Sequence, residues 1–89
     1  MYEKKPVKNK NTISRKIEDE TLVLDLLTKQ YHILNETAGK IWELSDGNHT
    51  IQEIAEEICK EYDKSVDIVK DDVLHTVEGL SKVGVISME

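Results

Sequence analysis

The chain is poor in the residues that form covalent or metal-based crosslinks. Its 89 residues include one cysteine, Cys59, one proline, Pro6, and no phenylalanine. A single cysteine excludes an intrachain disulfide framework and cannot supply the several thiolates of a typical structural zinc site. The three histidines, His32, His49 and His75, show no H-E-x-x-H motif or other short ligand spacing. We therefore predict no metal and no cofactor, so packing must stabilise the fold.

Long apolar runs are also absent. Apolar residues make up 38% of the chain and charged residues 34%, and no apolar segment is long enough to cross a membrane. No apolar stretch follows the lysines of residues 1–11, so this segment is not predicted to be a secretory signal. A chain of this length buries only about 60–65% of its unfolded surface, which does not favour a deep enzyme cavity. We expect a cytoplasmic protein with one core.

Charge is distributed unevenly along the chain. The net charge is −6, yet half of the 12 basic residues lie within residues 1–16, beside Glu3 alone. We expect residues 1–11 to form a flexible basic arm and residues 12–89 to form a single domain. The acidic body would repel a phosphate backbone, whereas nucleic-acid binding draws its affinity from Lys and Arg side chains. Nucleic acid is therefore not an expected partner.

Three short segments near the start of the domain have the composition of β-strands. Residues 12–17 (T-I-S-R-K-I) and 21–27 (T-L-V-L-D-L-L) are rich in β-branched and aliphatic residues and are separated by a polar turn. Residues 31–34 (Y-H-I-L) follow three further polar residues, although the glycine that hairpin loops favour is missing. The pattern predicts three antiparallel strands joined by two hairpins.

Two helices are predicted after the strands. Asn35 can accept a hydrogen bond from an unpaired amide of a helix that begins at Glu36, and the Asp46-Gly47 pair ends that helix. Thr50 and Glu53 have the T-x-x-E spacing of a capping box, and an apolar stripe follows them. The second helix therefore begins at this box.

A third helix is predicted to begin at Asp67 and to end before Gly84. Its apolar stripe has the spacing four, four and three and consists of Val69, Val73, Val77 and Leu80. Residues 85–86 then either add a terminal strand or pack against the core. Three strands followed by three helices predict a winged-helix-like α+β domain, in which a small antiparallel sheet lies against one side of a three-helix cluster.

Several segments of the chain resemble the PqqD-like family. Residues 31–47 read Y-H-I-L-N-E-T-A-G-K-I-W-E-L-S-D-G and residues 50–55 read T-I-Q-E-I-A. Further similarity lies in L-V-L-D at residues 22–25 and G-V-I at residues 84–86, so the resemblance covers most of residues 12–87. It implies a non-catalytic recognition element that binds the leader segment of a ribosomally synthesised, post-translationally modified peptide (RiPP). Such a protein delivers the precursor to a separate enzyme.

The same resemblance implies where the leader binds. It would lie as an added strand between the third strand and the third helix, because an edge strand has unpaired backbone groups that an extended peptide can satisfy. The residues expected to line this site are Tyr31, His32, Ile33, Val69, Asp72, Val73, Thr76 and Leu80. At Thr76 relatives often have a large apolar or aromatic residue, so the side-chain preference of the site stays open.

Other conspicuous residues are interpreted as structural. Trp42 lies on the apolar stripe of the first helix and is predicted to be core. Cys59 is predicted to be a small packed side chain, since no activating base is evident nearby in sequence. The pairs at residues 56–57 and 71–72 are adjacent carboxylates, which point in different directions on a helix and are typical of solvated faces. No catalytic residue is predicted.

The choice of partner and two other functions stay open at this point. The enzyme served is either a radical-chemistry maturase, of the radical SAM type, or a leader protease of the kind used for lasso peptides. A winged-helix transcription regulator is compatible with the helix order, but the third helix offers more acidic than basic side chains. A third alternative is a scaffold subunit without peptide binding. We expect a monomer or a weak dimer.

Overall fold

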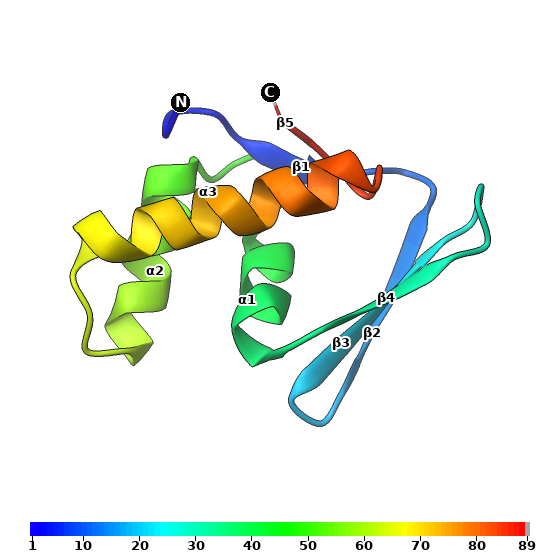
Figure 1. The fold of residues 1–89 in the computed structure, drawn as a ribbon, viewed down its shortest axis with the longest axis horizontal. Coiled ribbons are helices and arrows are strands. Elements are labelled where there is room, and N and C mark those ends of the chain that lie inside the picture. The colour runs from blue at the N-terminus through cyan, green and yellow to red at the C-terminus, as the bar shows by residue number, and fades with distance from the viewer. Residues whose placement is uncertain (89) are drawn as a thin grey trace.

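Two small sheets and three helices make up the computed structural model, which describes residues 1–88 (Figure 1). The central elements are β2 (Thr12–Ile17), β3 (Glu20–Asp25), β4 (Tyr31–Leu34), α1 (Glu36–Leu44), α2 (Ile51–Glu61) and α3 (Val66–Lys82). Strands β2, β3 and β4 form an antiparallel sheet in that order. The predicted α+β class, with three strands followed by three helices, is confirmed.

A second sheet joins the two ends of the chain. Strand β1 (Pro6–Lys8) pairs antiparallel with β5 (Ile86–Met88), and Val7 also bridges to Asp46. Residues 6–8 lie within the arm that we expected to be flexible. They are instead paired, with Pro6 fully buried, because the distant β5 supplies a partner strand.

Both hairpins turn without glycine. Glu18 and Lys29 adopt positive φ angles of 56° and 66°, the left-handed conformation for which glycine is preferred. In the second hairpin the carboxylate of Asp25 accepts hydrogen bonds from the amides of Leu27 and Thr28, at 2.9 and 3.3 Å. This turn ends β3 at Asp25, two residues before the predicted end, and leaves Leu27 73% exposed.

Side chains determine where each helix begins. The Asn35 carboxamide accepts from the Ala38 amide at 2.9 Å, and Thr50 and Glu53 form both hydrogen bonds of the predicted capping box. Ser65 caps α3, which therefore begins at Val66, one residue before the predicted start. All three helices thus begin within one residue of the predicted positions.

The core lies between the inner face of the three-stranded sheet and the helices. Val23 and Leu34 contribute from the sheet, and Ile41 and Trp42 contribute from α1. The burial of Trp42 agrees with its predicted role in the core. This packing places β4 at the edge of the sheet that leads directly into α1 (Figure 1).

The helix α1 and the strand β3 approach each other closely at Gly39. A Cβ atom at this position would lie 2.6 Å from the Thr21 hydroxyl oxygen, whereas a Cβ at Gly79 in α3 would meet no atom within 4 Å. We expect Gly39→Ala to lower the free energy of unfolding by about 1–3 kcal/mol through overpacking. Gly79→Ala should raise it by about 0.5–1 kcal/mol, because alanine restricts the unfolded chain. Urea denaturation of both variants measures the difference, and equal stabilities would contradict the close packing.

Candidate functional site

One edge of β4 is open. Its backbone pairs with β3 through the register Leu22 to Ile33 and Leu24 to Tyr31, and the Asp25 amide donates to the carbonyl of Gln30 at 2.8 Å. Hydrogen-bonded and non-hydrogen-bonded pairs alternate along an antiparallel ladder. The amides and carbonyls of Tyr31 and Ile33 therefore point away from β3, and within residues 1–88 no strand is paired with them. They can bond to an extended peptide.

The side chains of β4 alternate between two faces of the sheet. Leu34 is only 7% exposed and packs in the core, and His32 shares that inner face with Val23. Tyr31 and Ile33 are 65% and 62% exposed and lie on the outer face. The three predicted β4 residues therefore take different places: Tyr31 and Ile33 offer backbone groups at the open edge, whereas His32 directs its side chain toward the helices.

A pocket of about 150 Å³ lies between the three helices. It is lined by Thr37, Ile41, Ile58, Tyr62, Lys64, Val69, Asp72, Val73 and Thr76. Thr37 belongs to the first turn of α1, which follows β4 directly, so the pocket lies close to the end of the open strand. A cavity of roughly this volume, lined by apolar side chains, can hold a benzene ring. The pocket is thus large enough for one apolar side chain.

The structure brings together four of the five α3 residues that were predicted for the site. Val69, Asp72, Val73 and Thr76 all line the pocket, whereas Leu80 does not. Leu80 is 8% exposed and belongs to the core cluster, one turn further along α3. It contributes to the site only through the packing that supports the helix.

Sequence reasoning missed the other side of this pocket. Ile41 and Ile58 are buried in the core, and they also form part of the pocket lining. Tyr62 follows α2 and is fixed by a hydrogen bond from its hydroxyl to the Glu36 carboxylate at 3.0 Å. The spacing of four after Ile58 places Tyr62 on the apolar stripe of the second helix, but no motif marks Tyr62 or Lys64 as part of a site, because the packing of the helices brings them to the pocket.

The outer face of the sheet carries several exposed apolar side chains. Ile13 and Ile17 from β2 lie on it with Leu22 from β3 and Ile33 from β4. Part of this face forms a shallow pocket of about 210 Å³, lined by Ile17, Glu20, Leu22 and Ile33. Contiguous apolar surface of this kind is typical of protein interaction sites.

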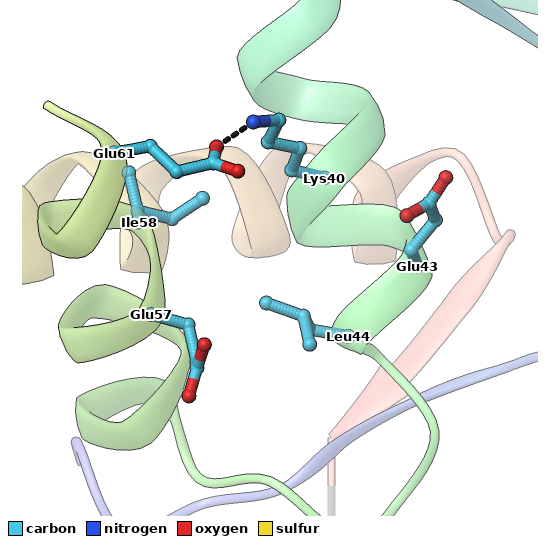
Figure 2. Close-up of a pocket in the computed structure, with 6 residues that line it drawn as sticks. All are labelled: Lys40, Glu43, Leu44, Glu57, Ile58 and Glu61. Carbon is cyan, nitrogen blue, oxygen red and sulfur yellow. Dashed lines mark ion pairs between the residues drawn. The ribbon is translucent and has the colours of Figure 1, made fainter.

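A third pocket lies between α1 and α2 and, unlike the two described above, is lined mainly by charged side chains (Figure 2). Its volume is about 200 Å³, and it is lined by Lys40, Glu43, Leu44, Glu57, Ile58 and Glu61. Glu61 is paired with Lys40, and Glu57 is paired with Lys60 at 2.9 Å. Two of its three carboxylates are therefore already neutralised by lysines, so the pocket does not resemble an acid–base pair prepared for catalysis.

Among residues 1–88, a further pair of ionisable groups lies in the loop before α2. His49 pairs with Asp46 at 3.0 Å in the loop before α2, which raises the pKa of His49 and lowers the pKa of Asp46. Within residues 1–88, no three His, Cys, Asp or Glu side chains are grouped so that they could hold a metal ion. Cys59 is half-buried beside the core. The helices of this part of the chain are too short or too polar to cross a membrane.

Comparison with known proteins identifies the family. Residues 20–86 match the family of coenzyme PQQ synthesis protein D (PqqD). The chain therefore belongs to the PqqD family. No curated protein matches the chain.

Three solved structures share the fold. TbiB1 in complex with the TbiA(beta) leader peptide superposes with a TM-score of 0.84 at 26% identity, covering 91% of this chain and 94% of that one. Lasso peptide synthetase B1 complexed with its leader peptide has a TM-score of 0.83 at 19% identity, covering 93% and 98%. The PqqD part of Methylobacterium extorquens PqqCD, a stand-alone RiPP recognition element, has a TM-score of 0.77 at 24% identity, covering 92% and 87%.

The direction of the β4 amides can be tested without any ligand. Ile33→Pro removes an amide that points to the open edge, so the variant should remain folded, as edge strands tolerate proline there. His32→Pro removes an amide that bonds to β3 and should lower the free energy of unfolding by about 1–3 kcal/mol, because a ladder hydrogen bond is lost and its carbonyl partner is left unsatisfied. Circular dichroism shows whether each variant is folded, and urea unfolding measures the difference in their free energies of unfolding. Equal destabilisation would show that the assigned direction is wrong.

Proposed function

We propose that this protein binds the leader segment of a RiPP precursor as an added strand on the open edge of β4 and has no catalytic activity of its own. The single observation that supports this most is the unpaired edge at Tyr31 and Ile33, which ends beside a pocket lined by α3. Family membership and the leader complexes of the similar proteins TbiB1 and lasso peptide synthetase B1 point to the same function.

The affinity for the leader backbone and the selectivity for leader side chains would come from different parts of the site. The outward-pointing amides and carbonyls of Tyr31 and Ile33 would bond to the leader backbone whatever its sequence. Alternate leader side chains would turn toward the helices, where the pocket at Val69, Asp72 and Thr76 can hold one of them. A leader that is disordered when free loses conformational freedom on binding, which keeps the affinity moderate and the complex reversible.

The other leader side chains would turn outward and extend the apolar face that includes Ile17, Leu22 and Ile33. We propose that the maturation enzyme contacts this face and receives the precursor there, in the cytoplasm. A radical-chemistry maturase and a leader protease both remain candidates for this enzyme. The exposed face also allows a weak dimer when no enzyme is present.

DNA binding is disfavoured by the charges of α3. Lys70 is one of its two basic residues, and it is already engaged with the ring of Tyr2 and with Asp67 at 3.5 Å. Asp71, Asp72 and Glu78 add negative charge to the same helix. Such a surface would repel the phosphates that supply most of the affinity for DNA.

The strand-addition model predicts the effect of proline on leader binding. We expect leader peptides from precursors encoded beside this gene to bind in a saturable manner, measured by isothermal titration calorimetry. Ile33→Pro should weaken this binding by about fivefold to tenfold, since one backbone hydrogen bond is lost. Ile33→Val, which keeps the amide, serves as the control. Unchanged affinity in folded Ile33→Pro would exclude docking at this edge.

The pocket is tested by enlarging a side chain at its rim. Thr76→Phe places a ring where a leader side chain would enter, and we expect leader affinity to fall about tenfold or more, as for overpacked sites. Glu78→Phe adds the same ring two residues away on α3, outside this pocket. Fluorescence anisotropy with a labelled leader measures both affinities, and Thr76→Phe should bind more weakly than Glu78→Phe. Equal affinities would exclude the pocket from leader recognition.

A further inference from the structure

The N-terminal segment is fixed to the start of α2 by its backbone. The carbonyl of Tyr2 accepts from the Gln52 amide at 3.1 Å, and the carbonyl of Lys4 accepts from the Ile51 amide at 3.0 Å. The first amides of a helix have no partner within the helix, so these bonds satisfy groups that would otherwise need water. Residues 2–4 therefore cap α2 in addition to its own capping box.

From this position the side chain of Tyr2 reaches α3. Its hydroxyl donates a hydrogen bond to the Asp71 carboxylate, and the Lys70 ammonium lies 4.8 Å from the centre of its ring. The ring is half-buried and packs against the core cluster. A hydrogen bond to a charged carboxylate and a cation over an aromatic ring both stabilise this contact. The segment thus connects α2 and α3, and Figure 1 shows its blue end on the side of the molecule where α3 crosses α2.

The turns of α3 that contact Tyr2 are the turns that line the candidate pocket. Lys70 and Asp71 face the N-terminal segment, whereas Val69, Asp72 and Val73 face the pocket. The contact of Tyr2 therefore ties the α3 wall of the pocket to the N-terminal end of α2.

We propose that residues 1–5 form a strap that holds the first half of α3 in place for leader binding, with Tyr2 as a positioning residue. This inference rests on the proposed function, since it assigns the strap a role at the same site. Tyr2 does not contact the leader in this proposal. It lowers the conformational entropy that α3 would lose when the leader binds, and so preorganises the pocket.

Two measurements on the full chain test the strap. In the free protein, Tyr2→Ala should speed hydrogen exchange of the amides of residues 70–76. In leader titrations it should weaken binding by about twofold to tenfold, the factor that corresponds to one net hydrogen bond. Tyr2→Phe keeps the ring over Lys70 but loses the bond to Asp71, so its effect should lie between wild type and Tyr2→Ala.

Asn9→Ala is the control for a merely structural effect. The Asn9 carboxamide bonds to the carbonyl of Gly84 and accepts from the Ser87 hydroxyl at 3.0 Å, so the variant loosens the same chain end away from the pocket. It should lower global stability without changing leader affinity or exchange at residues 70–76. The strap is overturned if Tyr2→Ala leaves that exchange unchanged, or if Asn9→Ala weakens leader binding equally. If wild type binds no leader, the proposed function fails, while the exchange data still decide whether Tyr2 restrains α3.

Discussion

The pairing of β3 with β4 is the constraint on which the rest of the site depends. Val23 and Leu34 bury their side chains against the helices, and this burial decides which face of the sheet is inner and which is outer. A slip of one residue would exchange the two faces, so the register is strongly specified. The same register sends the amides of Tyr31 and Ile33 to the open side. The direction of the groups at the open edge is thus a direct consequence of core packing.

The alternation of β4 separates two tasks that a peptide carrier must perform. Side chains of an added strand would point in turn toward the helices and toward the outer face, because every strand alternates. The helical side offers a pocket with polar groups from Asp72 and Thr76 at its lining, which suits selection of the peptide. The outer side offers exposed Ile13 and Ile17, which suit contact with another protein. In the proposed model, selection of the peptide and contact with a partner protein can therefore occur at the same time.

Local signals predicted much of this fold because they depend on neighbouring residues. The capping box at Thr50 and Glu53 and the strand at residues 31–34 are read from a few adjacent side chains, and both are present in the structure. A terminal strand near residues 85–86 was one of the two expected outcomes, but β1 and its pairing with β5 were missed because the two strands lie at opposite ends of the chain. Tyr2 was placed in a flexible arm for the same reason, since its partners on α3 are distant in sequence.

Side-chain direction limits what the sequence alone indicates about the site. Ile33 and Leu34 are both apolar, and the alternation of the strand together with the packing of the sheet leaves Leu34 buried and Ile33 exposed. Leu80 continues the stripe of Val69 and Val73, yet the pocket ends before it. Periodicity identifies the face of a helix, but the neighbouring helices decide how much of that face is covered.

The contact of the N-terminal segment with α3 also affects how readily the proposed site could release a leader peptide. The pocket is bounded by α1, α2 and α3, and its α3 wall is tied to the chain's N-terminal segment through Tyr2 and Asp71. A preorganised wall reduces the entropy lost on binding, whereas a leader that is disordered when free must still be ordered. The first effect raises affinity and the second lowers it. The proposed carrier, which would bind a precursor and then yield it to an enzyme, needs this balance, and the Tyr2 contact outside the site would be a means of adjusting it.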